Sequence, residues 1–189
     1  MNKAITALAL GASLLGGTCA LAQNDAPGMA GTPGMAMTPL GDTDKQFLTQ
    51  AAQGIIADYA NGAAAVNRAQ SPAVRQLGIW FMEDHDRLNI SLFALAGSKG
   101  LNLPLTMTAQ DQSDLTTLTA KQGADFDRGW LQQAIKTNKQ DISDAEKQMK
   151  TATDPEVKPM IRAYLSTEYG HLAAAQTIMA GMGKAMGRR

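Results

Sequence analysis

Several features that define whole classes of proteins are missing from this 189-residue chain. Its one cysteine excludes an internal disulfide framework and a cysteine metal pair. The 17 Lys and Arg residues balance the 17 Asp and Glu residues, so the basic surplus of a nucleic-acid-binding protein is lacking. No apolar run reaches the roughly 18 residues of a membrane span. Aromatic residues make up 5% of the chain and valine and isoleucine are few, which favours an all-α fold.

The first 22 residues have the parts of a secretory signal peptide. Lys3 supplies the positive charge, residues 4–15 are apolar, and the sequence A-L-A at 20–22 is a cleavage signal. We therefore expect cleavage after Ala22 and export to the periplasm of a Gram-negative bacterium. Cleavage also removes Cys19, and the residues before this cysteine lack the branched apolar side chain of a lipobox. We expect no lipid anchor.

Residues 23–41 are rich in glycine and proline and lack apolar periodicity, which predicts a disordered lead. This lead contains methionines whose thioethers suit Cu(I), so the sequence leaves open whether it binds copper or is a spacer. The helical domain is expected at residues 42–182, followed by a flexible tail at 183–189. The methionines of the lead are Met29, Met35 and Met37.

Helix start and stop signals divide the domain into four long runs. A capping box over residues 43–46 begins the first run, and Ser71-Pro72 and Asp154-Pro155 begin the second and the fourth. A short helix beginning at Thr108 lies in the link between the second and third runs. The long runs are expected at about residues 44–70, 71–98, 124–151 and 154–182.

The lengths of the links predict how the four helices are connected. The first and second runs are joined almost directly, as are the third and fourth, so each pair should form an antiparallel hairpin. The longer link, with its short helix, could span the length of a bundle. These features predict an all-α, ferritin-like four-helix bundle, with two hairpins joined by a crossover. A plain up-and-down bundle with a folded-back loop is the alternative.

Each long run has an apolar stripe at spacings of three and four, and polar residues interrupt each stripe near its midpoint. Because midpoints coincide in a bundle, these residues should form one polar layer. Both histidines of the chain fall in it. The predicted members are Asp58, Asp84, His85, Asn138, Glu168 and His171.

Two structures could satisfy such a buried polar layer. One is a hydrogen-bond network that fixes the register of the helices, and the other is a transition-metal site with imidazole and carboxylate ligands. Glu168-x-x-His171 has the spacing of bundle di-metal sites, but Met82 stands where a second such glutamate would be needed. The shortage of acids favours the structural network over a mononuclear site, and both over a di-metal oxidase centre. The metal-ligand candidates are Asp58, Asp84, His85, Glu168 and His171.

Little else in the sequence indicates chemistry. There is no glycine-rich phosphate loop and no nucleophile elbow, so no catalytic residue is assigned and we expect a protein that is not an enzyme. Trp80 and Trp130 are expected to pack between helices. Three late methionines are expected to form an apolar stripe, and four lysines a solvated face. These residues are Met179, Met182 and Met186, and Lys136, Lys139, Lys147 and Lys150.

Five stretches in order resemble an exported bacterial family called domain of unknown function 4142. The stretches are FLTQAAQG (47–54), SPAVRQLGIWFMEDH (71–85), LAGSKGLNLP (95–104), GADFDRGW (123–130) and EYGHL (168–172). The resemblance implies a ferritin-like bundle without an established enzymatic activity. It also implies an acid at Asp58, the Asp84-His85 pair, a final His171, and a histidine in relatives where this chain has Asn138.

These observations predict an exported periplasmic bundle protein that acts without catalysis in the cell envelope or in stress tolerance, and that has no cofactor. The alternative is a ferritin-like protein that binds a transition-metal ion at the mid-bundle Asp, His and Glu residues. Its partners cannot be predicted from the sequence.

Overall fold

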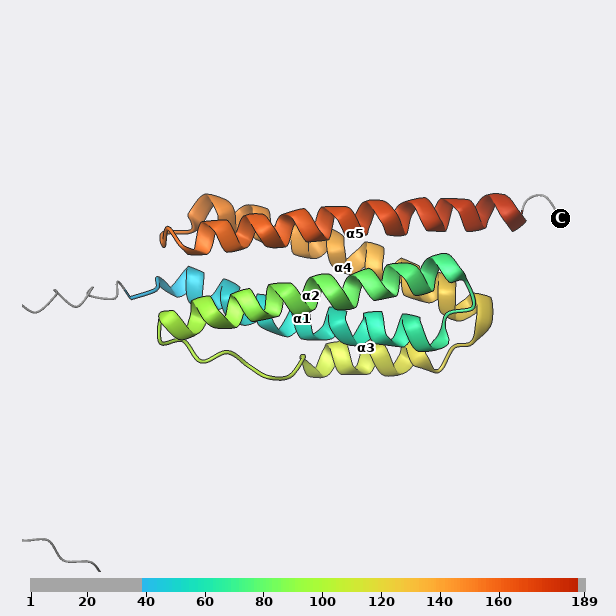
Figure 1. Cartoon of the computed structure of the whole chain (residues 1–189), viewed down its shortest axis with the longest axis horizontal. Helices are drawn as coiled ribbons and strands as arrows, with labels where there is room; N and C mark the ends of the chain where they lie inside the picture. The colour runs from blue at the N-terminus through green and yellow to red at the C-terminus, as the bar shows by residue number, and fades with distance from the viewer. Residues whose placement is uncertain (1–38, 187–189) are drawn as a thin grey trace, which may run out of the picture. The chain divides into compact units, whose positions relative to one another are not determined.

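The structure, a computed structural model, describes residues 39–186 and consists there of five α-helices without strands (Figure 1). The all-α prediction is therefore confirmed for this part of the chain. The predicted signal peptide and nearly all of the predicted lead lie outside the described residues. The helices are α1 (Asp42–Arg68), α2 (Pro72–Ser98), α3 (Ala109–Thr119), α4 (Gly123–Thr151) and α5 (Val157–Met186).

The ends of the helices correct three details of the prediction. The capping box expected over residues 43–46 is wrong, because α1 begins at Asp42 and Gly41 precedes it without a side-chain cap. A capping box is present instead at Thr108, where Asp111 returns the hydrogen bond. The fourth long helix begins at Val157 rather than directly after Asp154, and it continues to Met186 rather than ending at 182.

Each of the four long helices packs against two neighbours, so that together they form a closed bundle. Helix α1 packs against α2 and α4, and α5 packs against α2 and α4. Figure 1 shows α2 and α4 running in the same direction, each antiparallel to its hairpin partner. The short helix α3 lies along α1 and returns the chain from the end of α2 to the start of α4.

Apolar side chains from all four long helices form the core. One cluster includes Leu48 and Ile161, and the other includes Phe81 and Trp130. The polar residues near the helix midpoints lie between these two clusters along the bundle. The predicted apolar stripe near the end of α5 is confirmed for Met179 and Met182, which pack against the second cluster.

The two tryptophans have different environments. Trp130 is 1% exposed, and its indole N–H donates to the backbone oxygen of Asn61 over 2.8 Å. Trp80 is 47% exposed, so the prediction that it packs between helices was wrong. Phe81 occupies the inward position on α2, and its neighbour in a helix is rotated by roughly 100° and therefore faces outward.

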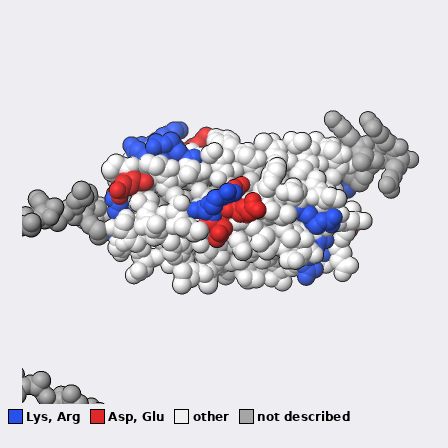
Figure 2. Space-filling model, viewed as in Figure 1, with Lys and Arg blue, Asp and Glu red and all other residues white. Residues whose placement is uncertain are grey.

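Charge is unevenly visible on the surface. On the face drawn in Figure 2, basic and acidic side chains lie in small separate groups and most of the face is uncharged. The four lysines expected to form a solvated face, which begin at Lys136, are all exposed. Within residues 39–186, no helix has an apolar stretch long enough to cross a membrane.

The two hairpins correspond to each other at a constant offset in sequence. His85 and Glu168 are 83 residues apart, and the same offset relates Ser71-Pro72 to Asp154-Pro155 and the buried Val74 to the buried Val157. Helices α1 and α4 also end at equivalent residues, Arg68 and Thr151. The second hairpin therefore repeats the first in the positions of these residues, although α4 and α5 are slightly longer than α1 and α2.

A buried aspartate near the start of each hairpin binds the link of the other hairpin. Asp44 on α1 accepts hydrogen bonds from the backbone N–H groups of Thr153 and Asp154, from the Thr153 hydroxyl and from the Gln148 amide. Asp127 on α4, again 83 residues later, accepts from the N–H groups of residues 70 and 71. These carboxylates hold the two ends of the bundle together.

Candidate functional site

The centre of the polar layer is a contact between α2 and α5. The Nε2 atom of His85 lies 3.2 Å from Oε1 of Glu168 and 3.5 Å from Oδ2 of Asp58 on α1. The side chains of His85 and Glu168 have no solvent exposure, and that of Asp58 is 6% exposed. Three helices therefore bring ionisable groups together inside the bundle.

A backbone hydrogen bond on the side away from Glu168 fixes the orientation of the His85 ring. Its Nδ1 atom lies 2.8 Å from the backbone oxygen of Phe81, one turn earlier on α2. A carbonyl oxygen can only accept, so Nδ1 carries the proton of this bond. In the neutral ring the lone pair is then on Nε2, which faces Glu168 and Asp58.

His171 is held in the same way, but by a side chain. Its Nε2 atom donates to Oδ2 of Asp84 over 3.0 Å, while Nδ1 is buried and has no hydrogen-bond partner within the described residues. Burial, followed by the charge of His85, lowers the pKa of His171 to about 4 despite the hydrogen bond to Asp84. The ring, which stacks on Phe81 at a centroid distance of 4.2 Å, is therefore neutral near pH 7.

Three carboxylates meet on the other side of Glu168. Oxygen atoms of Asp58, Asp141 and Glu168 all lie within 4.8 Å of one another. Burial raises the pKa of Glu168 to about 8, and burial together with the charge of Glu168 raises the pKa of Asp141 to about 8. The pKa of Asp58 is also raised, by burial and by Glu168, although His85 opposes the shift. Without a cation, the cluster holds protons instead of three negative charges.

Besides Nδ1 of His171, two oxygen atoms in this layer have unmet hydrogen-bonding capacity. Oε2 of Glu168 and Oδ1 of Asn138 are buried without a partner among residues 39–186. The amide nitrogen of Asn138 donates to the backbone oxygen of Glu168 over 3.3 Å. Buried oxygens of this kind are costly unless a donor or a cation reaches them.

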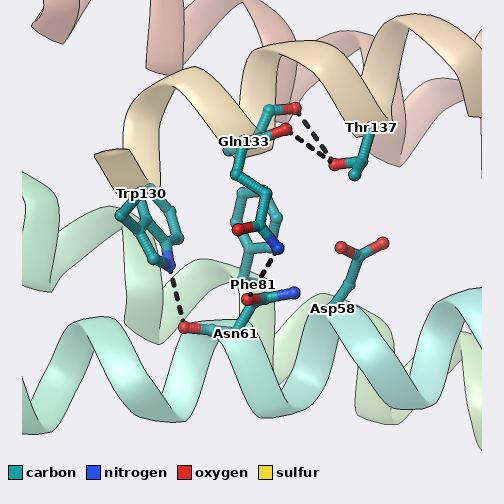
Figure 3. A pocket seen from close by; sticks show the side chains of 7 residues that line it. Asp58, Asn61, Phe81, Trp130, Gln133 and Thr137 are labelled. Carbon is teal, nitrogen blue, oxygen red and sulfur yellow. Dashed lines mark hydrogen bonds between the residues drawn. The ribbon is translucent and has the colours of Figure 1, made fainter. Parts of the chain in front are cut away.

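A narrow pocket lies beside Asp58. Figure 3 shows the Asp58 carboxylate projecting from α1 toward α4, with no hydrogen bond to the other residues drawn. In contrast, Asn61 accepts from Trp130 through its backbone and from Gln133 through its side chain. The ionic contact of Asp58 is instead with His85, at 3.5 Å.

Comparison with known proteins identifies the family. A profile described as domain of unknown function (DUF4142) matches residues 30–178. The chain belongs to the DUF4142 family. No curated protein matches it.

One solved structure shares the fold of this DUF4142 chain. The crystal structure of a DUF305 fragment from Deinococcus radiodurans matches with a TM-score of 0.68 and 15% sequence identity. The match covers 76% of this chain and 99% of the other. At this level of identity the likeness concerns the fold alone.

The structure brings four of the five predicted ligand candidates of this DUF4142 chain together. His85, Glu168 and His171 offer nitrogen and oxygen atoms within 4.8 Å of one another, and Asp58 joins them through His85. Asp84 lies apart, because its half-exposed carboxylate contacts His171 from outside and binds Arg87 over 2.6 Å. Both histidines are buried, as the predicted layer requires.

Asp141 is a member of the cluster that the sequence pattern did not predict. It lies one turn beyond Asn138 and beside the apolar seam of α4, so it does not interrupt the apolar stripe of this helix. The repeat could have revealed it, because Asp141 follows Asp58 at the same 83-residue offset that relates His85 to Glu168. The two hairpins thus contribute equivalent pairs, Asp58 with His85 and Asp141 with Glu168.

Proposed function

We propose that this DUF4142 chain is an exported, ferritin-like helical-bundle protein that binds a divalent transition-metal ion at the mid-bundle cluster. The cluster is defined by Asp58, His85, Asp141 and Glu168. Export is supported by the signal-like N-terminus, and the ferritin-like arrangement by the shared direction of α2 and α4 with α3 in the link between them. Binding of the ion, rather than catalysis, is the proposed role, and its place is the periplasm.

The observation that carries this proposal is the unpartnered Oε2 atom of Glu168. It is fully buried, and its carboxylate lies within 4.8 Å of those of Asp58 and Asp141. A cation placed among these oxygens would satisfy Oε2 and allow all three acids to ionise. The Nε2 lone pair of His85 would add an imidazole ligand, and mixed imidazole and carboxylate ligands suit Zn(II), Fe(II) and Mn(II).

The histidines also have the outer hydrogen bonds typical of metal ligands. A ligating imidazole commonly donates its other N–H to a carbonyl or a carboxylate, which fixes the ring and its tautomer. His85 does so to Phe81 and His171 to Asp84. His171 is therefore available on the opposite side of Glu168, with Nδ1 free of a partner among the described residues.

Metal-dependent melting of the purified, chelator-treated chain tests the proposal. A ligand that binds only the folded state at about 100 times its Kd adds about 2.7 kcal/mol, so Zn(II), Fe(II) or Mn(II) should raise the Tm clearly. Glu168→Gln should abolish this rise. Asp144→Asn, at an exposed position one turn from Asp141, is the matched control and should retain it. Equal rises in the wild type and in Glu168→Gln would contradict the proposal.

A structural network is the second candidate function for the same layer. It is favoured by the two contacts that join α2 to α5, His85 with Glu168 and His171 with Asp84. If this network is the whole role of the layer, no metal ion should change the Tm. His85→Ala should then cost about 1–3 kcal/mol, because its partners would be left unsatisfied.

A further inference from the structure

A cavity with acidic walls connects the cluster with the outside of the bundle. It has a volume of about 290 Å³ and lies between α1, α3 and α4. Its charged lining consists of four carboxylates and one ammonium group. These are Asp58, Asp111, Asp114, Asp141 and Lys136.

The inner end of this cavity is the candidate metal site itself, because Asp58 and Asp141 belong to both. The outer wall is α3. There Asp114 accepts a hydrogen bond from Gln110, and Asp111 is held by the capping box at Thr108. Both acids of α3 therefore have defined positions at the outer wall.

A second cavity reaches the cluster from the opposite side of α1. It has a volume of about 170 Å³, and apolar side chains including Ile55, Ile56 and Tyr59 line it beside His85. Its lining contains one carboxylate, Asp86. The two cavities thus offer a cation very different surroundings.

We propose that the acidic cavity under α3 is the route by which a divalent cation reaches the buried cluster. The inference rests on the proposed function and adds a role for the crossover helix. Carboxylates in a narrow, low-dielectric passage focus the field and raise the local concentration of cations. Even with protons on Asp58 and Asp141, the two acids of α3 outweigh Lys136, so the lining favours a divalent cation over an anion, whereas the second cavity offers mainly apolar contacts.

The rate of metal uptake tests the route separately from the affinity of the site. Co(II) is mixed with the chelator-treated full chain in a stopped-flow instrument, and its visible absorption reports entry into the protein ligand set. Asp114→Lys should slow association about fivefold, and Lys136→Glu should accelerate it about twofold. Dissociation should change in parallel, because the passage is used in both directions, so Kd should change less than the rates. Added salt should reduce both effects.

Asp86→Lys, at the second cavity, is the matched control and should leave the association rate unchanged. Asp114→Asn, which keeps a polar group beside Gln110, guards against loss of folding and should slow uptake about twofold. Equal rates in the wild type and in a folded Asp114→Lys variant would overturn the route. A larger effect of Asp86→Lys would assign entry to the second cavity. A wild-type chain that binds no Co(II), Zn(II), Fe(II) or Mn(II) would overturn the proposed function and the route with it.

Discussion

Two pairs of aspartates occupy equivalent places in the two hairpins but have opposite surroundings. Asp44 and Asp127, near the ends of the bundle, are buried and accept hydrogen bonds from backbone N–H groups. Asp58 and Asp141, at the middle, face each other and Glu168. Burial alone therefore does not tell what a buried acid does in this protein.

The number of donors makes the difference. A carboxylate that accepts several N–H groups is satisfied where it is and stabilises the fold. A carboxylate that faces other carboxylates is stable only when it takes up a proton or a cation. The end aspartates thus have a structural role, and they fix the hairpin links between which the middle ones are held.

The largest expected effect is the loss of an end aspartate. Asp44→Ala should lower the free energy of unfolding by about 3–5 kcal/mol, because it leaves buried donors on the α4–α5 link without an acceptor. Asp42→Ala, two residues earlier on the exposed face of α1, should change it by less than about 0.5 kcal/mol. Urea unfolding of both variants measures the contrast. Similar losses in the two would mean that the end contacts of Asp44 are not what holds the link.

The middle acids should make the free energy of unfolding depend on pH. The folded-state pKa values of Glu168 and Asp141 are raised to about 8, whereas in an unfolded chain they lie near 4. Between these values the folded state binds more protons, so the stability of the metal-free protein should fall as the pH rises, by about 2 kcal/mol for each of the two groups from pH 6 to pH 8. His171, with its lowered pKa, acts in the opposite direction only below about pH 6.5.

Urea unfolding at pH 6, 7 and 8 in the presence of a chelator measures this dependence. A Glu168→Gln, Asp141→Asn double variant should flatten it, because neither amide titrates. A metal-free protein that gains stability from pH 6 to pH 8 would show that the middle acids are charged in the folded state.

The smallest effects are expected when one aspartate is replaced by asparagine, either at the end or at the middle of the bundle. Asp127→Asn should cost about 1–2 kcal/mol, since the amide nitrogen cannot accept from the backbone N–H groups at the α1–α2 link. Asp58→Asn should leave the metal-free protein unchanged or about 0.5 kcal/mol more stable, because it removes one of three clustered acids. Thermal unfolding of the two chelator-treated variants measures the difference in their stability. Equal destabilisation would show that the end and middle aspartates do not differ in their contribution to the fold.

The helices and the level of the polar layer followed from the sequence because they depend on local signals. Pro72 and Gly100 mark helix ends, and the spacing of apolar residues places Glu168 and His85 on inner faces. The midpoints of helices of similar length lie at the same level in any antiparallel bundle. The proximity of the polar residues at these midpoints could therefore be predicted without knowledge of tertiary contacts. Only the residues exactly on a seam could be identified in this way, and Asp141 lies beside one.

Other properties of the site depend on contacts that a linear pattern does not contain. Which nitrogen of His85 faces inward is decided by the carbonyl of Phe81, one turn away on the same helix but in a specific rotamer. That Asp84 remains half-exposed depends on the rotation of α2 against α5. The charge state of Glu168 depends on how completely the packed helices bury it.

The gapless correspondence of the two hairpins has a consequence for how such a centre can change over time. In an assembly of identical hairpins, every substitution at the centre would occur in all copies at once. In a single chain each half varies alone, which is why His85 and Glu168 can stand at matching places with a nitrogen on one side and an oxygen on the other. A single chain with two matched hairpins can therefore change the atoms and the charge of its central cluster one residue at a time, while the equivalent aspartates at both ends keep the shared architecture unchanged.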